Sequence, residues 1–565
     1  MIKVTFGTPE QHVPSAYCPT FAYTPTSVSY PTDAITYEQT ARGVLITMPL
    51  TEDEHIYGLG LQLKAFDLRG RKWVMRPNAD PVAATGDSHA PVPFFASTAG
   101  YAVYVDTARY AEFYFGSSAP RGRRAESGES AVMDSTDQLY ATRVQSDARI
   151  VIFIPFATGV DLYLFEGDTI TDMVAQYNRL AGGGCTVPEW GLSTIYRCYT
   201  GYTQDVVLEK AKKFKADGMD VGIIGLEPGW QTHSYSCSYV WSDRYPDPKG
   251  LLKDLREMDY HVNLWEHAYV HPTAPIYDEL IALSGDYEVW QGLVPDFTLK
   301  EARDSFAAHH KTIVDSGVDG FKLDECDGSD YTGSWMFPIF TKFPSGIDGD
   351  QYRSLFGITY MQTVLQALGD HPTLSEVRNA GALAAPYPFV LYSDLYDHKD
   401  FIRGCATAGF SGLLWTPELR DAQSKDEFLR RLQATVFSVQ SLINAWYCEE
   451  EPWVAHDCKD EVKYWLSVRR GLIPLLKDAF DRYHNTGIAP CRAVVSDYSH
   501  DPETYQIDDE YLLGDRLLVA PLAVGEEERR VYLPAGNWRD YFTKEPVQNG
   551  WFTVKTDCIP VYETY

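Results

Sequence analysis

The chain has 565 residues and a formal net charge of −29 at pH 7. Nucleic acid and anionic membrane surfaces would be repelled by this charge, so both are excluded as expected partners. The length exceeds that of one ordinary core and allows two or three domains, one of which can be a barrel of ~250 residues.

The ten cysteines are scattered, with no CxxC pair and no spacing typical of a zinc site or of a dense disulfide framework. Free thiols of this kind indicate a reducing compartment. The first residues lack the basic and apolar segments of a signal peptide, and no run of about 18 apolar residues occurs. We therefore predict a soluble cytoplasmic protein that binds no membrane and needs no cofactor or metal. The sequence is compatible with a homo-oligomer and leaves the oligomeric state open.

Residues 1–180 contain short alternating apolar and polar segments separated by turn residues, as at 149–154. This pattern is typical of antiparallel strands and predicts an N-terminal β-sandwich. Two loops rich in glycine, proline and histidine, EHIYGLGLQ at 54–62 and GDSHAPVPFFAS at 86–97, have the reach to meet a neighbouring site, although turn chemistry also explains their composition. Three consecutive glycines and Pro188 mark the boundary that follows.

From residue 187 to residue 488, short apolar runs alternate with helical periodicity, which is the pattern of parallel βα units. Strands are predicted at residues 192–196, 221–226, 261–265, 320–324, 373–377, 389–393, 411–415 and 441–445. Helices are predicted at residues 204–217, 250–259, 299–316, 351–369 and 425–438. Strand patterns return at residues 489–565. The predicted fold class is therefore α/β, a (β/α)8 TIM barrel flanked by an N-terminal β-sandwich and a C-terminal β-domain.

Polar or aromatic side chains follow each of the eight predicted barrel strands. They are Arg197, Glu227 with Trp230, Glu266 with His267, Asp324, Arg378, Asp394, Glu418 and Asn444. Each one alone is also explained as a solvated loop residue. Catalytic residues in such barrels come from the carboxyl ends of the strands, so the recurrence predicts that these side chains converge on one site.

Lys322 and Asp324 lie two residues apart on the strand at 320–324 and therefore point to the same side of it. Asp324 is placed at the tip of the strand, where an adjacent ammonium group would keep it ionised. This makes Asp324 the candidate nucleophile. A salt bridge at a strand end is the alternative interpretation of the same two residues.

Glycoside hydrolysis suits a barrel mouth with several carboxylates, because one carboxyl group must protonate the leaving oxygen while another attacks the anomeric centre. Asp394, Asp397, Asp400 and Glu418 are the candidates for the acid. Asp394 is favoured because it follows the sixth strand directly, where partial burial would raise its pKa. Asp397 and Asp400 are better explained as residues at a helix N-terminus.

Two other chemistries find no support in the motifs. The DECDGSD run at 324–330 lacks the residue order of a calcium loop. No GxSxG segment with a plausible nucleophile elbow is present, so serine hydrolysis is not indicated.

The chain resembles glycoside hydrolase family 31, the retaining α-glycosidases, in motifs whose order and spacing are specific when taken together. These are GVDGFKLDECD at 317–327, EVRNAGALAAPYPFVLYSD at 376–394, and DRLLVAPL, VYLPAGNW and IPVY between 515 and 562. The resemblance extends over nearly the whole chain. It implies that the K-x-D strand carries the nucleophile, Asp324 behind Lys322, that Arg378 holds the substrate, and that Asp394 is the acid/base.

The chain departs from this family at three positions that line the family's −1 sugar subsite. After the second strand, the family's glucosidases usually have Asp in a D-x-x-W pattern, and this chain has Glu227-Pro-Gly-Trp230. After the seventh strand they have W-x-H-D or a similar pattern, and this chain has Trp415-Thr-Pro-Glu418. After the eighth strand they have histidine, and this chain has Asn444. Altered carboxylate length and an amide in place of an imidazole would move the hydrogen bonds that read sugar hydroxyls. We therefore expect a glycone other than the terminal glucose of maltose.

The resemblance thus implies a retaining, exo-acting α-glycosidase for terminal α-D-hexosides of the α-galactoside or α-glucoside type, with an oligosaccharide or glycoside as its partner. Trp230, Trp265 and Trp415 are expected to wall the sugar ring. Two alternatives stay open. One is an α-glycosidase for a modified sugar such as N-acetylgalactosamine or xylose, and the other is a catalytically silent carbohydrate-binding or scaffold relative.

Overall fold

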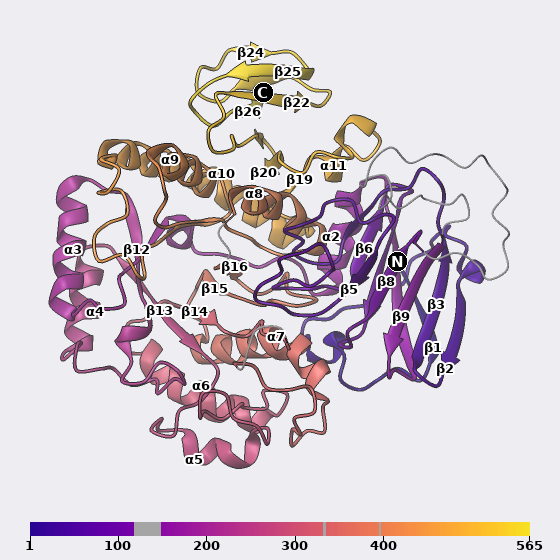
Figure 1. Cartoon of the computed structure of the whole chain (residues 1–565), viewed down its shortest axis with the longest axis horizontal. Helices are drawn as coiled ribbons and strands as arrows, with labels where there is room; N and C mark the ends of the chain where they lie inside the picture. The colour runs from indigo at the N-terminus through magenta and orange to yellow at the C-terminus, as the bar shows by residue number, and fades with distance from the viewer. Residues whose placement is uncertain (118–148, 331–334, 395–396) are drawn as a thin grey trace, which may run out of the picture.

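The structure is a computed structural model that describes residues 1–117, 149–330, 335–394 and 397–565. A parallel eight-stranded sheet with surrounding helices forms its middle, antiparallel sheets from the N-terminal part stand to the right in Figure 1, and a C-terminal β-region lies above. This arrangement confirms the predicted fold class. The domain boundaries at residues 180, 187 and 488 stay predictions.

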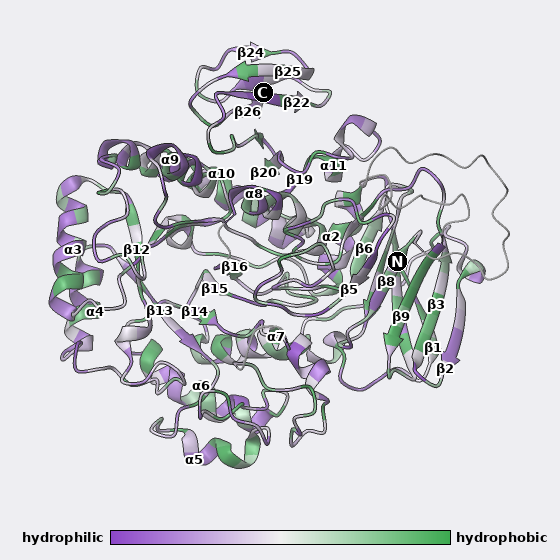
Figure 2. Ribbon diagram, in the orientation of Figure 1, coloured by the Kyte–Doolittle hydropathy of each residue, from purple (hydrophilic) through white to green (hydrophobic). Residues whose placement is uncertain are grey.

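The N-terminal strands form two five-stranded antiparallel sheets that share one apolar core. The first sheet, in spatial order, contains β1 (Ile2–Gly7), β10 (Gly159–Glu166), β7 (Tyr101–Asp106), β6 (Phe94–Ser97) and β4 (Ile56–Gly58). The second contains β2 (Thr36–Thr40), β3 (Gly43–Pro49), β9 (Arg149–Pro155), β8 (Glu112–Phe115) and β5 (Lys72–Val74). Every second residue of β9 is buried, and this face is the apolar side of a sandwich, coloured green in Figure 2.

Eight parallel strands make up the central barrel. They are β11 (Thr194–Arg197), β12 (Val221–Leu226), β13 (His261–His267), β14 (Gly320–Asp324), β15 (Ser375–Val377), β16 (Phe389–Leu391), β17 (Glu418–Leu419) and β18 (Ser441–Asn444). The sheet runs from β16 through β11 to β18 and β17, and a parallel bridge between Leu391 and Trp415 joins its two edges. The carboxyl ends of all eight strands therefore surround one opening.

The helices follow the strands in the order that βα units require. The longer ones are α2 (Ile170–Leu180), α3 (Gln204–Asp217), α4 (Pro248–Glu257), α6 (Lys300–Val314), α7 (Gly349–Leu368), α8 (His398–Thr407), α9 (Lys425–Val436) and α10 (Lys459–Thr486). Single turns are α5 (Tyr277–Leu280) and α11 (Val494–Asp497). The 3-10 turns are η1 (Pro14–Tyr17), η2 (Thr32–Ala34), η3 (Glu189–Leu192), η4 (Pro228–Trp230), η5 (Ile281–Leu283), η6 (Ala408–Ser411) and η7 (Pro502–Thr504).

The seventh strand lies elsewhere than the sequence predicts. Residues 411–415 were expected to be extended, but α8 continues into the 3-10 helix η6, which ends at Gly412 in the left-handed region with φ +67°. Because the chain turns there, only a single bridge at Trp415 precedes the strand Glu418–Leu419. Glu418 is thus inside the strand rather than after it.

The C-terminal region contains a six-stranded sheet and a separate hairpin-like pair of strands. The sheet contains β19 (Cys491–Ala493), β20 (Tyr511–Leu513), β21 (Leu517–Val519), β26 (Val561–Thr564), β23 (Trp538–Asp540) and β24 (Pro546–Val547). The pair is β22 (Glu528–Leu533) with β25 (Gly550–Lys555). All ten cysteines of the chain are unpaired thiols. In the described part of the chain, none of the helices combines the length and the apolar character needed to cross a bilayer.

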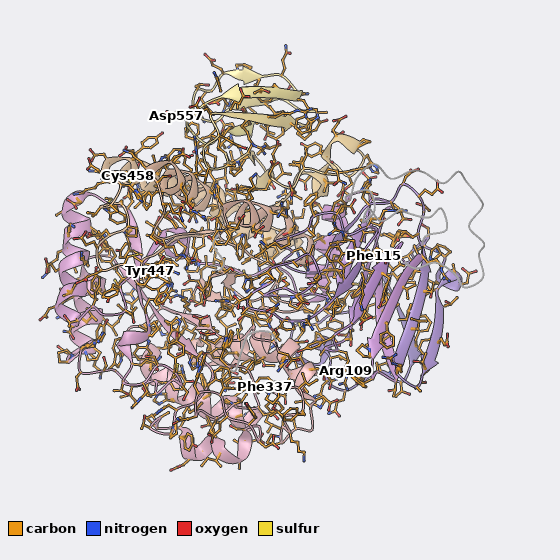
Figure 3. The ribbon with its side chains drawn as sticks, in the orientation of Figure 1. Arg109, Phe115, Phe337, Tyr447, Cys458 and Asp557 are labelled. Carbon is orange, nitrogen blue, oxygen red and sulfur yellow. The ribbon has the colours of Figure 1, made fainter. Side chains whose placement is uncertain are left out.

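Arg109 ties the sandwich to the barrel, and Figure 3 shows it between the N-terminal sheets and α7. Its guanidinium group donates to Glu10 at 2.7 Å and to Asp350, in the first turn of α7, at 2.9 Å. Asp348 lies 2.7 Å away on the same side. These ion pairs are partly shielded from water, so they help to fix how the sandwich loops approach the barrel opening.

Arg469 of α10 closes the opposite, amino-terminal end of the barrel. Its buried guanidinium donates to the carbonyl oxygens of Leu192, Val436, Ser438 and Val439, at 2.7, 3.0, 2.5 and 3.1 Å. Those residues precede β11 and β18, which are the first and the last strand of the barrel. Burial lowers the pKa of Arg469 to about 9, because the charge is held without a carboxylate partner.

Replacing Arg469 by methionine should destabilise the protein by about 3 kcal/mol or more, because four buried carbonyl groups would lose their donor. Arg470 is the matched control, since its side chain is 67% exposed and pairs with Asp220 at the surface. Arg470→Met should change stability by less than about 1 kcal/mol. Thermal and urea unfolding midpoints would compare the two, and equal effects would contradict the role of Arg469.

Candidate active site

The structure brings most of the predicted residues together at the carboxyl ends of the strands. Arg197, Asp324 and Asn444 are the last residues of β11, β14 and β18. Glu227, Arg378 and Asp394 follow β12, β15 and β16, and Glu418 begins β17. Glu266 is the exception. It points away from the opening and contacts Tyr360 at 2.7 Å and His310 at 3.0 Å, because alternate residues of a strand face opposite sides.

Arg378 is the centre of this site. Its guanidinium is buried, and three carboxylates surround it. Nε donates to Asp327 at 3.0 Å, Nη1 lies 3.6 Å from Asp324, and the same Nη1 forms an ion pair with Asp394. Burial disfavours the charged guanidinium, but the carboxylates outweigh this effect and raise the pKa of Arg378 well above its usual value. The side chain is therefore a permanent cation that holds the two predicted catalytic aspartates near one point.

Asp324 is buried and precisely oriented by two donors. The indole Nε1 of Trp265 donates to it at 2.6 Å, and the backbone N–H of Glu325 donates at 2.9 Å. Burial raises the pKa of Asp324, and the charges of Lys322 and Arg378 oppose that rise without cancelling it. A carboxylate held in this way has one defined direction of attack.

Lys322 lies on the same face as Asp324, as strand alternation predicts, but its ion pair is with another residue. Its ammonium group lies 3.2 Å from Glu227, and its charge sits 4.9 Å above the ring of Tyr392. Glu227 also accepts from Arg197 at 2.9 Å. The expected Lys322–Asp324 salt bridge is thus replaced by a contact across the barrel, because Glu227 comes from β12 and approaches from the interior.

A layer of buried charges forms the floor of the site. Arg197 donates to Asn263 at 2.9 Å and also pairs with Glu376 of β15. Together with Lys322 and Glu227, these side chains balance two cations against two carboxylates inside the barrel. Sequence reasoning missed Asn263 and Glu376, because both lie within strands, whereas the search was for polar residues at strand ends.

Asp394 differs from the expectation in its ionisation. Its side chain is 48% exposed at the opening. Burial pushes the pKa of Asp394 upward, but the charges of Arg378, Lys322 and Arg420 outweigh that effect and lower the pKa. Partial burial was expected to raise it. The difference arises because Arg378 contacts Asp394 directly.

Asp397 and Asp400 have the structural role that the sequence predicts. Asp397 caps α8 by accepting from the backbone N–H of Asp400 at 3.0 Å. Asp400 pairs with Lys64 and, at 3.3 Å, with Arg403. Among the described residues, neither aspartate forms a hydrogen bond or an ion pair with Arg378 or with the carboxylates around it.

Glu418 and Asn444 form a buried polar pair on the other side of the opening. Asn444 donates to Glu418 at 2.8 Å, and Arg420 lies 3.3 Å from the second carboxylate oxygen. Burial raises the pKa of Glu418 to about 7, against the charge of Arg420. Within the described part of the chain, Oε1 of Glu418 and Oδ1 of Asn444 lack a hydrogen-bond partner. Buried polar atoms of this kind are available to a ligand hydroxyl.

The three predicted wall tryptophans are all buried, and each indole N–H group has a hydrogen-bond acceptor. Trp230 donates to the carbonyl of Trp265 at 2.6 Å, and Trp415 donates to the carbonyl of Phe401 at 3.1 Å. Trp265 donates to the carboxylate of Asp324 itself. Their role as walls of the sugar ring stays a prediction.

The N-terminal loop at 86–97 reaches the site, as its composition suggested. His89 is fully buried, with Nδ1 2.7 Å from Asp327 and Nε2 2.7 Å from Ser393. It therefore connects the segment after β14 to the segment after β16 and supports Asp327 beneath Arg378. The sequence indicated the loop but not the residue, since no local pattern marks a histidine that pairs 238 positions away.

Among the residues that the structure describes, no group of three or more histidine, cysteine, aspartate or glutamate side chains is arranged to hold a metal ion. The functional groups at the site are carboxylates, cations and aromatic side chains.

Comparison with known proteins identifies the family. Residues 185–479 match the family model described as "Glycosyl hydrolases family 31 TIM-barrel domain". The chain belongs to glycoside hydrolase family 31. Residues 487–563 match the C-terminal domain of the same family, and residues 19–113 match its N-terminal galactose mutarotase-like domain. These matches confirm the resemblance seen in the sequence.

Several curated members of family 31 are similar to the chain at low identity. Alpha-glucosidase 2 of Bacillus thermoamyloliquefaciens is 24% identical over 91% of this chain and 67% of its own length. An alpha-xylosidase of Emericella nidulans is 22% identical over 89% of this chain and 63% of its own length. The chain therefore spans about two thirds of the length of these relatives.

Solved structures of family 31 share the fold. A Flavobacterium johnsoniae dextranase complexed with glucose superposes with a TM-score of 0.79 at 21% identity, covering 94% of this chain and 67% of the dextranase. A cycloalternan-degrading enzyme of Trueperella pyogenes, in complex with a covalent intermediate, gives a TM-score of 0.76 at 21% identity and covers 96% of this chain and 80% of that enzyme.

The raised pKa of Glu418 predicts a pH dependence of stability. An acid whose pKa rises from 4.5 to about 7 on folding retains its proton in the folded state after the unfolded chain has released it. Stability should therefore fall as pH increases from about 4.5 to 7, by up to about 1.4 kcal/mol per pH unit from this group. Glu418→Gln should flatten this part of the curve. Glu257→Gln, on the surface of α4, is the control, and an equal slope in both variants would contradict the assignment.

Proposed function

We propose that this chain is a retaining, exo-acting α-glycosidase that removes a terminal α-linked sugar by double displacement through a glycosyl-aspartate. The observation that carries the proposal is the meeting of Asp324 and Asp394 at one guanidinium nitrogen of Arg378. Two carboxylates that share one contact atom lie close together, which favours the short separation of a retaining pair, about 5–5.5 Å, over the longer one of an inverting pair.

In the first step Asp324 attacks the anomeric carbon while the bond to the leaving oxygen breaks. Asp394 donates its proton to that oxygen, and a glycosyl ester forms on Asp324. In the second step Asp394 takes a proton from water, and the water oxygen attacks the same carbon. Asp324 is released as a carboxylate, and the sugar leaves with its α configuration retained.

The ionisation of Asp394 must change in the course of this reaction. Arg378 favours the charged form of Asp394, although an acid must carry a proton. A sugar bound between the carboxylates would separate Asp394 from Arg378 and would present a developing positive centre to Asp324. Asp324 and Asp394 then titrate as a coupled pair, and the proton they share lies on Asp394. Bound substrate therefore helps to set which of the two aspartates is protonated.

The altered sugar-reading positions support a glycone of galactose type, glucose type or a modified sugar such as N-acetylgalactosamine or xylose. Glu418 and Asn444 present acceptor oxygens without hydrogen-bond partners in the described residues, while Glu227 is already engaged by Arg197 and Lys322. A sugar hydroxyl that donates to the Glu418–Asn444 pair would be read strongly, since a mismatch would leave buried acceptors unpaired. Curated relatives include alpha-glucosidases and alpha-xylosidases, which shows that the family accepts different sugars.

The first test is a panel of nitrophenyl α-glycosides of glucose, galactose, xylose and N-acetylgalactosamine, with NMR detection of the first anomer released. We expect turnover of a sugar other than glucose, with release of the α anomer. A β anomer would contradict retention. Turnover confined to the glucoside, with strong maltose activity, would contradict the altered sugar reader.

Asp324→Asn should lower kcat/KM by at least about 10³-fold, because the nucleophile is lost. Asp394→Asn should lower it by about 10²-fold to 10⁴-fold on glycosides with poor leaving groups, and by much less on glycosyl fluorides, which need no protonation. Asp397→Asn keeps an equally good helix cap and is the matched control. Mass spectrometry with a fluorinated α-glycosyl probe should find the adduct on Asp324. An unlabelled wild-type protein without turnover would indicate a catalytically silent relative.

His89→Leu should lower kcat by about tenfold to a hundredfold, because Asp327 would lose one of its two partners and Arg378 would be less well positioned. His89→Gln should recover part of the rate, since the amide restores one polar contact. His500→Leu, at an exposed histidine that pairs with Asp168 at 3.1 Å, is the control. Equal values of kcat in the His89 and His500 variants would show that His89 does not help to position Arg378.

A further inference from the structure

An aromatic wall extends outward from the catalytic carboxylate. Trp265, which donates to Asp324, lies 5.4 Å from the ring of Tyr235. Tyr235 meets Trp290 edge to face at 4.9 Å, and Trp290 lies parallel to Trp335 at 6.0 Å with an angle of 9° between the rings. Tyr235 is 53% exposed, whereas Trp290 and Trp335 are half-buried. The rings therefore form a continuous series of contacts from Trp265, which is buried beside Asp324, to the exposed Tyr235 and its neighbours Trp290 and Trp335.

The turn that presents Trp290 is strained. Val289 and Gly292 exchange both backbone hydrogen bonds, at 3.0 and 2.8 Å, and enclose a two-residue turn. Trp290 and Gln291 have φ values of +50° and +63°, the signs of a type I′ turn, which normally selects asparagine and glycine. A tryptophan in the left-handed region is unfavourable for the fold, so its retention points to a role for the ring itself.

The loop that carries Tyr235 holds this turn in place. A Cβ atom on Gly292 would lie 2.4 Å from the Cβ of Ser236, so only glycine allows the two segments to approach. Ser236 also donates to the carbonyl oxygen of Trp290 at 3.3 Å. The segments after β12 and β13 thus form one rigid unit, and the ring positions are fixed before any ligand binds.

Glu325 adds a polar group at the base of the wall. It follows Asp324 directly, has φ +56°, and its carbonyl oxygen accepts from Tyr269 at 3.1 Å. In the described part of the chain, its carboxyl group forms no hydrogen bond and no ion pair. A carboxyl group beside aromatic faces suits a neutral polyhydroxyl ring, which offers O–H donors and an apolar C–H face, and it disfavours an anionic ligand.

We propose that Tyr235, Trp290 and Trp335 form a leaving-group subsite that stacks a second, neutral pyranose, with Glu325 binding its hydroxyls. The proposal rests on the proposed function, because it places this sugar on the far side of the bond that Asp324 and Asp394 break. The substrates are then α-linked oligosaccharides, and the leaving sugar supplies binding energy for the reaction.

The test compares substrates with and without a leaving sugar. An α-glycosyl fluoride of glucose or galactose has no leaving sugar, whereas maltotriose, isomaltotriose and raffinose have one. We expect Trp290→Ala to lower kcat/KM for the oligosaccharide that the wild type cleaves by at least about tenfold more than for the matching fluoride. Trp290→Phe should recover much of the difference. A loss of equal size on both substrates would overturn the subsite.

Two further variants separate the ring from the turn and from general effects. Gln291→Gly relaxes the same turn without removing a ring, and should raise the thermal unfolding midpoint while the ratio between oligosaccharide and fluoride stays near that of the wild type. Trp551→Ala removes an exposed tryptophan of β25 in the C-terminal region and should leave the same ratio unchanged.

A binding measurement distinguishes failure of this subsite from failure of the proposed function. In Asp324→Asn, maltotriose, isomaltotriose or raffinose should change the intrinsic tryptophan fluorescence, and Trp290→Ala in the same background should weaken that binding by about tenfold. Absence of a Trp290-dependent change for all three sugars would overturn the subsite, even with an active enzyme. Wild-type protein that hydrolyses no fluoride would overturn the proposed function, whatever the binding result.

Discussion

The active-site arrangement depends on one buried guanidinium group. Arg378 is contacted by Asp324, Asp327 and Asp394, which come from segments after two different barrel strands. Three carboxylates brought so close together in a partly dehydrated opening would repel one another, and at least one would be neutral without a cation between them. The barrel supplies the positions, but Arg378 is what allows those positions to be occupied by acids.

The same cation holds the two candidate catalytic carboxylates in different ways. Its closest carboxylate is the half-exposed Asp394, while the buried Asp324 is held by Trp265 and by a backbone N–H group. Exposure lets Asp394 exchange partners and protons, whereas burial keeps Asp324 fixed. An acid/base must exchange protons, and a nucleophile must keep one position. The exposed Asp394 and the buried Asp324 match these two requirements although their side chains are identical.

Periodicity alone located much of the barrel. The strands β12 and β14 and the helix α3 have the predicted bounds, because their apolar spacing and their flanking glycines act locally. The strand near Gly412 was misplaced, since a left-handed glycine ended a helix that the apolar pattern could not distinguish from a strand.

Contacts between distant segments were harder to predict. Alternation correctly placed Lys322 beside Asp324, yet the closer partner, Glu227, comes from a strand almost a hundred residues earlier. Trp230 and Trp415 were assigned to a sugar wall on their position after strands, but the backbone carbonyl groups that fix them come from other segments. The exposed Tyr235 and its neighbour Trp290 lie in loops whose sequence has no strand or helix period.

His89 has a consequence for how this architecture can be rearranged in evolution. Its ring enters the barrel from a sandwich loop and contacts both Asp327 and Ser393. A chimera that joined this barrel to the sandwich of another protein would lack this ring unless the new loop supplied an equivalent one. The charge network of the barrel is therefore built in part from the sandwich, and exchange of the sandwich alone would disturb the site.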